Sequence, residues 1–153
     1  MMAGFEGRDT ADVRAGDIVV GVDGSPSATD ALRWAADQAR LTGARLHAVT
    51  AWQLPVYYGW APLDTFDDDL AAAAGKVLSG AVREVLGDNA IDSEVVESVV
   101  AGHPAQVLID ASARAALLVI GSRGHGAFAE ALLGSVSHQC VQHAACPVVV
   151  VRH

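Results

Sequence analysis

Short runs of β-branched apolar residues alternate with segments of helical pattern along most of this chain. The apolar runs cover residues 18–22, 45–51, 93–100, 117–120 and 147–151, and the helical segments about 26–42, 65–86, 104–113 and 135–144. Runs of this kind are typical of strands that are buried on both faces, and strands that alternate with helices form parallel sheets. We therefore predict an α/β fold, a doubly wound five-stranded parallel sheet with helices on both faces, of Rossmann-like type.

The first helix is specified in most detail. Ser25 can accept hydrogen bonds from the first free N–H groups, Pro26 suits the first helical position, and Gly43 can end the helix. Five apolar residues share one face of this segment: Ala28, Ala31, Leu32, Ala35 and Ala39. We expect that face to pack on the sheet.

The length of 153 residues is that of one domain with a core of its own. Residues 1–16 are polar and aperiodic and predict a flexible tail, which leaves residues 17–153 as the folded domain. No apolar run approaches the roughly 20 residues of a membrane helix, so we expect no membrane partner. The N-terminus has no secretory signal pattern and the chain has only two cysteines, which favours a cytoplasmic protein.

The net charge is −8 and the isoelectric point is about 5.0, which argues against a nucleic-acid partner. A phosphate ligand would therefore have to be held by local backbone N–H groups and helix dipoles.

A glycine-rich loop follows the fourth predicted strand. It begins as Gly121-Ser122-Arg123-Gly124-His125-Gly126, and Gly134-Ser135 then opens the last helix. Glycines let successive N–H groups point into one anion-binding concavity, and a helix N-terminus favours a phosphate. The alternative is that these glycines only let the chain turn. Arg123 and His125 either add positive charge to this loop or project into solvent, and the sequence leaves both open.

Asp23 follows the first strand, in the sequence Asp23-Gly24-Ser25. If the first and fourth strands are neighbours, Asp23 and the glycine-rich loop lie together where the strand order reverses, which is where open α/β sheets bind ligands. The carboxylate could bond ribose hydroxyls or hold a cation such as Mg²⁺. The alternative is a turn residue in an Asp-Gly turn.

The spacing Gly121-x-x-Gly124, nine residues, then Gly134-Ser135 resembles the ATP-binding signature of the universal stress protein family. Three further stretches agree with that family: VVGVDGS from Val19, Gly102-x-Pro104, and Cys146-Pro147 followed by three valines. The similarity spans residues 18–152. It implies the strand order 3-2-1-4-5, homodimers formed through the strand from Pro147 to Val151, and the subclass that binds ATP.

The resemblance also implies roles for individual residues. Adenine would lie near Gly21, Val22 and Ala48, and Asp23 would approach the ribose or a phosphate-bound Mg²⁺. Gly121, Ser122 and Gly124 would hold the ribose and the first phosphates, and Gly134, Ser135, Val136 and Ser137 would hold the remaining ones. The segment 52–66, which contains two tryptophans and two tyrosines, could form a flap or cover the core.

Four residues near the end of the chain invite a metal site: His138, Cys140, His143 and Cys146. Helical geometry argues against it, because His138 lies about 200° around the helix from Cys140. We expect no metal and no catalytic residue in this chain.

The function that these observations favour is that of a cytoplasmic, ATP-binding regulatory protein of the stress response, acting as a nucleotide-dependent dimer. A weak ATP hydrolase or phosphotransferase is the first alternative, although the Gly-Lys-Ser/Thr phosphate loop is absent from the sequence. A partner-binding protein with a vestigial nucleotide site is the second. ATP, ADP, AMP and cyclic AMP are all left open as ligands.

Overall fold

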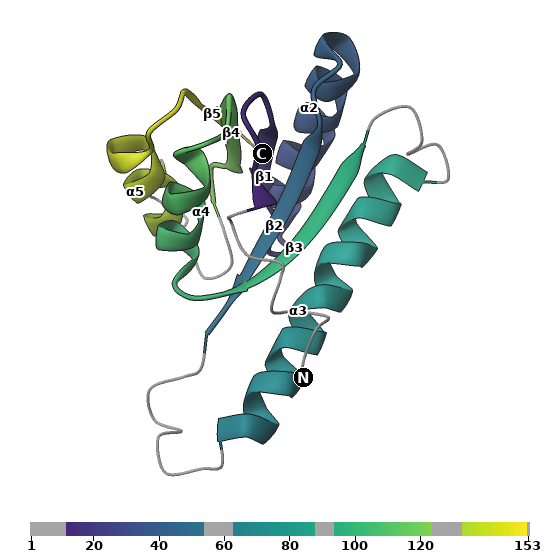
Figure 1. The fold of residues 1–153 in the computed structure, drawn as a ribbon, viewed down its shortest axis with the longest axis vertical. Coiled ribbons are helices and arrows are strands. Elements are labelled where there is room, and N and C mark those ends of the chain that lie inside the picture. Colours follow the sequence, from purple (N-terminus) through teal and green to yellow (C-terminus); the bar gives the residue numbers. More distant parts are fainter. Residues whose placement is uncertain (1–11, 54–62, 88–93, 124–132, 153) are drawn as a thin grey trace.

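A computed structural model describes residues 12–53, 63–87, 94–123 and 133–152. Along the chain its elements are β1 (Ile18–Gly21), α2 (Pro26–Thr42), β2 (Leu46–Trp52), α3 (Leu63–Leu86), β3 (Val95–Ala101), α4 (Pro104–Ser112), β4 (Leu117–Gly121), α5 (Ser135–His143) and β5 (Val148–Val151) (Figure 1). The strands form one sheet in the order β3-β2-β1-β4-β5, and every neighbouring pair is parallel. The predicted fold class and strand order are confirmed.

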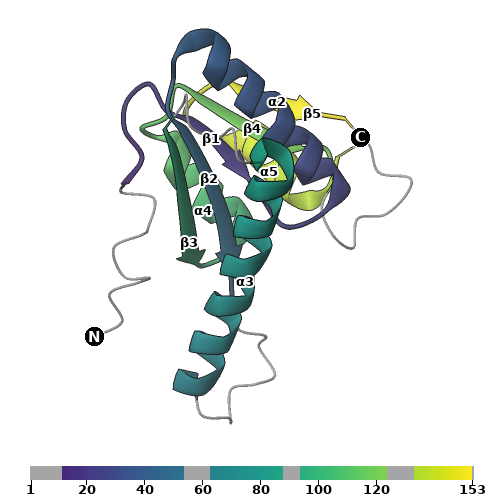
Figure 2. The same ribbon diagram turned by 90° about the vertical axis from the view of Figure 1, so that its right-hand side faces the viewer.

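Helices cover both faces of this sheet, α2 and α3 on one and α4 and α5 on the other (Figures 1 and 2). Each face has its own apolar cluster. Under α2 and α3 the cluster includes Val20, Leu32, Ala48, Leu78 and Val119. Under α4 and α5 it includes Val19, Val49, Leu108, Leu118 and Cys140. Residues next to each other in one strand therefore belong to opposite clusters, as expected for strands buried on both sides.

Helix α2 has the limits and caps that its sequence predicts. The Ser25 Oγ accepts from the Ala28 N–H at 3.2 Å. Gly43 takes the left-handed conformation, with φ 76°, and its N–H donates to the Ala39 carbonyl at 2.8 Å. The predicted apolar face is buried, including its five alanine and leucine positions.

The chain ahead of β1 packs on the domain from residue 13 onward. Val13 is fully buried against the α4 and α5 side of the sheet. Asp17 is buried as well, and its carbonyl accepts from the Ala116 N–H at 2.9 Å. The packed chain therefore begins earlier than the predicted boundary at residue 17, because Val13 supplies an apolar anchor. Residues 1–11 of the predicted tail lie outside the described residues.

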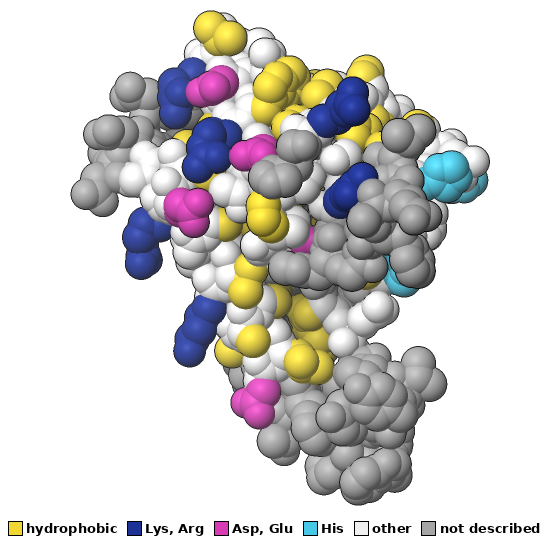
Figure 3. All heavy atoms as spheres, turned by 180° about the vertical axis from the view of Figure 1, so that it is seen from behind, with side chains coloured by type: hydrophobic (Ala, Val, Ile, Leu, Met, Phe, Trp, Pro, Cys, Tyr) yellow, Lys and Arg dark blue, Asp and Glu magenta, His cyan; other side chains and the backbone are white. Residues whose placement is uncertain are grey.

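Within the described ranges, no helix combines the length and the apolarity that crossing a membrane requires. Figure 3 shows acidic and basic side chains interspersed over the described part of the face seen from behind. That distribution is unlike the basic stripe of a nucleic-acid-binding surface.

Candidate functional site

Strand β1 is the point at which the strand order reverses. It pairs with β2 on one side and with β4 on the other, in a register that sets Val20 beside Val119. The segments that leave the carboxyl ends of β1 and β4 therefore start side by side. The first contains Asp23, two residues after the end of β1, and the second begins with Ser122. The condition on which the predicted site depends, that the first and fourth strands are neighbours, is met.

The N-terminus of α5 lies against this edge of the sheet. Gly134 is its N-cap residue and provides no side-chain hydrogen bond to the helix. The Gly134 N–H donates to the Ser122 carbonyl at 2.7 Å, which fixes the start of α5 next to the end of β4. Unlike the N-cap residue of α2, the N-cap residue of α5 thus supplies no side-chain acceptor to its helix, and a helix N-terminus capped by glycine leaves room for an anion.

The three residues after Gly134 differ in orientation. Ser135 is exposed and Val136 half-buried, whereas Ser137 is buried. The Ser137 Oγ donates to the Gly121 carbonyl at 2.5 Å. Ser137 was predicted to hold phosphate, but in this structure its hydroxyl joins α5 to the end of β4.

Two of the predicted glycines are required by helix packing. A Cβ on Gly121 would lie 2.5 Å from the Ser27 Oγ and 2.7 Å from the Ser27 carbonyl carbon, at the start of α2. A Cβ on Gly21 would lie 2.8 Å from a methyl carbon of Leu108 on α4. Both glycines therefore let a helix approach a strand closely, a reason that differs from the predicted approach of a ligand.

Asp23 is exposed at the same edge. One carboxylate oxygen, Oδ1, accepts from the Ser25 N–H at 2.9 Å and from the Ser25 Oγ at 2.5 Å. Gly24 between them has φ 83°, so the turn needs its glycine. The turn role that was the alternative for Asp23 is thus observed, and it sets the carboxylate beside the N-terminus of α2.

Ala48 is not brought to this edge. It pairs with Val20 in the middle of the sheet and is fully buried under α2 and α3. Val22 is buried too, and its N–H donates to the Val49 carbonyl at 2.8 Å. Because Gly21 is level with Val49, the β2 residue level with Asp23 is Ala51, which is half-buried. The first residues of β1 and β2, Ile18 and Leu46, pair with each other. Counting the same number of residues from each gives Asp23 in one segment and Ala51, not Ala48, in the other.

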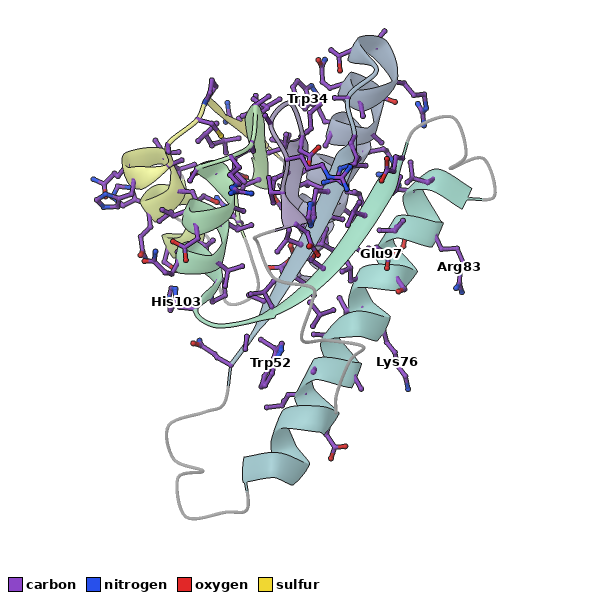
Figure 4. The ribbon with its side chains drawn as sticks, viewed as in Figure 1. Trp34, Trp52, Lys76, Arg83, Glu97 and His103 are labelled. Atoms are coloured by element: carbon purple, nitrogen blue, oxygen red, sulfur yellow. The ribbon has the colours of Figure 1, made fainter. Side chains whose placement is uncertain are left out.

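Part of the predicted site lies outside the described residues, namely Gly124 and His125 with the loop through residue 132. Arg123 is exposed, and its N–H donates to the Ser27 Oγ at 3.3 Å. Trp52 ends β2 on the side of α3 (Figure 4), while the rest of the aromatic segment, 54–62, is also outside the described ranges.

The histidines and cysteines near the C-terminus point in different directions. Cys140 is fully buried, and burial raises the pKa of its thiol to about 11. His138 and His143 are exposed. Among the residues that the structure describes, no three His, Cys, Asp or Glu side chains come together in a way that could hold a metal ion.

Comparison with known proteins identifies the family that this chain resembles. The model of the universal stress protein family matches residues 15–152. Universal stress protein Rv1996 of Mycobacterium tuberculosis (strain H37Rv) is 35% identical over 142 residues, which cover 88% of this chain and 43% of that protein. A universal stress protein of Mycolicibacterium smegmatis is 34% identical over 147 residues, covering 88% and 47%. The chain thus spans less than half the length of these relatives.

Solved structures agree on the fold. UspA from Lactobacillus plantarum aligns with a TM-score of 0.75 at 24% identity, over 92% of this chain and 100% of that one. A universal stress protein in complex with cAMP aligns with a TM-score of 0.65 at 27% identity, over 89% and 96%. One from Archaeoglobus fulgidus in complex with dAMP gives 0.53 at 23% identity, over 91% and 98%. With the family model matched over nearly the whole domain, this chain belongs to the universal stress protein family.

Proposed function

We propose that this chain is a regulatory protein of the stress response that binds an adenine nucleotide, with ATP as its ligand, between the carboxyl ends of β1 and β4. The observation that carries the proposal is the N-terminus of α5, whose N-cap residue Gly134 supplies no side-chain cap and is fixed by its bond to Ser122 at the end of β4. An adjacent exposed arginine, Arg123, supports it.

Phosphate binding must come from groups close to the ligand, because the chain as a whole carries a net charge of −8. The overall field opposes a triphosphate, so binding must rely on N–H groups that point at the ligand and on the positive end of the helix dipole. Asp23 suits a Mg²⁺ that accompanies the phosphates, since it is an exposed carboxylate whose position is fixed by Ser25.

The choice of an adenine nucleotide rests on relatives and on spacing. The complexes of related proteins contain cAMP and dAMP, which share an adenine base and a phosphate. The triphosphate rests on the spacing of Gly121, Gly124 and Gly134, which resembles the family's ATP-binding signature. ADP, AMP and cAMP are the competitors that a titration must include.

The two alternatives predict different measurements. A weak ATP hydrolase or phosphotransferase would release or transfer phosphate during hours of incubation, whereas a regulatory binding protein would return its ATP intact. A partner-binding protein with a vestigial site would be purified without nucleotide and would show no heat of binding. We propose binding without turnover.

The test is to replace Gly134 by aspartate and to titrate the folded protein with Mg-ATP by calorimetry. Gly134 has φ −68° and ψ 168°, a conformation open to any residue and suited to an N-cap. An aspartate there would accept hydrogen bonds from the first N–H groups of α5 and would repel phosphate. We expect Gly134→Asp to weaken ATP binding at least about tenfold. Because Gly134 is buried, circular dichroism and urea denaturation first establish that the variant is folded.

A matched control places the same charge elsewhere. Gly80 lies on α3, and a Cβ there would meet nothing within 4 Å. Gly80→Asp should therefore bind ATP like the wild type. If Gly134→Asp is folded and binds ATP as tightly as Gly80→Asp, the phosphates do not lie at α5 and the proposed site is wrong.

A further inference from the structure

A buried polar cluster lies away from the nucleotide edge, toward the ends at which β1 and β2 begin. Asp17 directly precedes β1, Arg45 directly precedes β2, and His47 is the second residue of β2. Ser98 of β3 completes the cluster. Asp17, His47 and Ser98 are buried, and the Arg45 side chain is 12% exposed. The proposed function uses none of these four residues.

The imidazole of His47 is satisfied on one side only. Its Nε2 is 2.7 Å from the Ser98 Oγ. Its Nδ1 is buried and has no hydrogen-bond partner in the described structure. The nearest acidic atom is the Asp17 Oδ2, at 3.7 Å. Buried polar atoms without a partner are rare, so this nitrogen calls for an explanation.

The same Asp17 carboxylate holds the chain ahead of β1. Its Oδ2 accepts from the Arg14 N–H at 2.9 Å and from the Arg45 Nη2 at 2.7 Å, and its Oδ1 accepts from the Arg45 Nε at 3.0 Å. The Arg45 Nη2 also donates to the Asp12 carbonyl at 2.7 Å. Residues 12–17 are thus tied down by one ion pair and by the buried Val13. We call residues 12–17 the N-terminal strap.

A serine, a histidine and an aspartate in this order resemble a hydrolytic triad, but these three do not form one. The side chains of Ser98 and His47 are fully buried, so neither can meet a substrate. The Nδ1 to Asp17 distance of 3.7 Å is also too long for the hydrogen bond that orients a catalytic histidine. The cluster must be explained by what it does inside the protein.

We propose that His47 makes the N-terminal strap sensitive to acid: while the imidazole is neutral the Asp17–Arg45 pair holds the strap, and protonation of His47 releases it. In the neutral tautomer whose Nε2–H donates to the Ser98 Oγ, a proton added to Nδ1 would create a donor 3.7 Å from the Asp17 Oδ2, the oxygen that already accepts from Arg14 and Arg45. Either the new donor displaces these two, or the strap opens so that water reaches the charged ring. Both outcomes loosen residues 12–17.

The charged groups around His47 and the burial of its ring decide whether protonation stabilises or destabilises the packed strap. Asp17 ahead of β1 and Asp12 in the strap attract a proton to the ring, whereas Arg45 ahead of β2 repels it. Glu94 ahead of β3 pairs with Arg45 at 3.4 Å. Burial, the largest influence, lowers the pKa of His47 below 6.5. The state in which the N-terminal strap is packed therefore prefers the neutral His47 ring. The stability of that state is lost as the pH falls below about 6.5.

Asp17 titrates in a separate range. Burial raises the pKa of its carboxyl, but the hydrogen bonds from Arg45 and Arg14 outweigh burial, and the pKa is lowered below 3.8. The stability that Asp17 adds is present above its unfolded pKa near 3.8 and is lost only as the pH falls further. Loosening of the strap between pH 7.5 and pH 5 therefore does not come from Asp17.

The experiment is amide hydrogen exchange by NMR on the full chain, expressed as protection factors from pH 7.5 to pH 5. The reporters are the Arg14 and Asp17 amides, which are bonded to the Asp17 Oδ2 and the Arg14 carbonyl. We expect their protection to fall several-fold between pH 7.5 and pH 5, while amides of β1 and β4 stay protected. His47→Gln, which keeps a group able to bond Ser98 but cannot gain a proton, should abolish the fall.

The control is His143→Gln on the exposed end of α5, which should behave like the wild type. Equal loss of protection in His47→Gln, or full protection of the wild-type strap down to pH 5, would overturn the proposal. If His47→Gln does not fold, the ring resonances of His47 in the wild type decide. Their titration midpoint must coincide with the midpoint of strap loosening, and a clear separation of the two midpoints would also overturn it.

Discussion

Gly21 ends β1 and Gly121 ends the neighbouring strand, β4. Gly21 leaves room for α4 on one face of the sheet, and Gly121 leaves room for α2 on the other face. At Gly121 the neighbour is the backbone of Ser27, whose carbonyl carbon and oxygen both lie 2.7 Å from an added Cβ. At Gly21 the neighbour is the flexible end of Leu108. Backbone at the start of α2 cannot move without disturbing the cap of that helix, whereas a leucine side chain can change its rotamer.

We therefore predict that Gly121→Ala costs about 3 kcal/mol of unfolding free energy and Gly21→Ala about 1 kcal/mol. Urea denaturation of the two variants and the wild type, with equal m-values, measures the difference. An equal or larger loss in Gly21→Ala would show that Leu108, and not the start of α2, is the rigid neighbour.

At the scale of elements, the two helix N-termini at the candidate site are satisfied in different ways. Helix α2 is capped by Ser25, whose hydroxyl accepts from the Ala28 N–H and donates to Asp23. Helix α5 begins at Gly134 without a side-chain cap. The N-cap residue of α2 thus satisfies N–H groups of its helix with its own side chain, whereas the N-cap residue of α5 does not, as the proposed phosphate site requires.

Ser25→Ala is predicted to lower the free energy of unfolding by about 1–2 kcal/mol, because the Ala28 N–H and the Asp23 carboxylate each lose a bond. Ser135→Ala, at the first turn of α5, is the control and should change stability by less than about 0.5 kcal/mol, since Ser135 is exposed. Chemical denaturation compares the two. A loss in Ser135→Ala as large as that in Ser25→Ala would mean that α5 is capped in a way this structure does not contain.

For the molecule as a whole, β5 is an edge strand of four valines with one neighbour, β4, in the described sheet. The Pro147 and Val151 carbonyls accept from the Leu118 and Ser122 N–H groups of β4. By the alternation of a strand, the peptide groups of Val148 and Val150 point away from β4. The strand at the opposite edge, β3, carries the charged Glu97, which disfavours pairing with a strand of another molecule. We therefore propose that the two-fold dimer forms through β5.

Val150→Pro tests this dimer by removing an outward N–H group while the bonds to β4 remain. Sedimentation at micromolar concentration should give a dimer for the wild type and a folded monomer for Val150→Pro. Val149→Lys is less selective, because Val149 also packs against the α2 and α3 cluster. A wild-type chain that sediments as a monomer, or a Val150→Pro variant that remains dimeric, would contradict assembly through β5.

The sequence by itself determined the elements and the fold class. Apolar runs of strand length and the Ser25 and Gly43 caps of α2 are local signals of this kind. The observed strand order, with β1 beside β4, was expected from the resemblance to the universal stress protein family, because local patterns do not encode which strands pair. Element ends differ by one or two residues, as at the start of α3, because the terminal turns of a helix depend weakly on any one residue.

Only the tertiary structure decided which residues face what. Ala48 proved to be core because strand register, set by packing on both faces, carries it three residues inside the edge. Ser137 turned toward Gly121, and Val13 joined the core, through contacts between residues far apart in the chain. The cluster of Asp17, Arg45, His47 and Ser98 unites three segments in the same way. Local patterns specify elements, whereas burial and partners follow from the packing of distant segments, which no local pattern encodes.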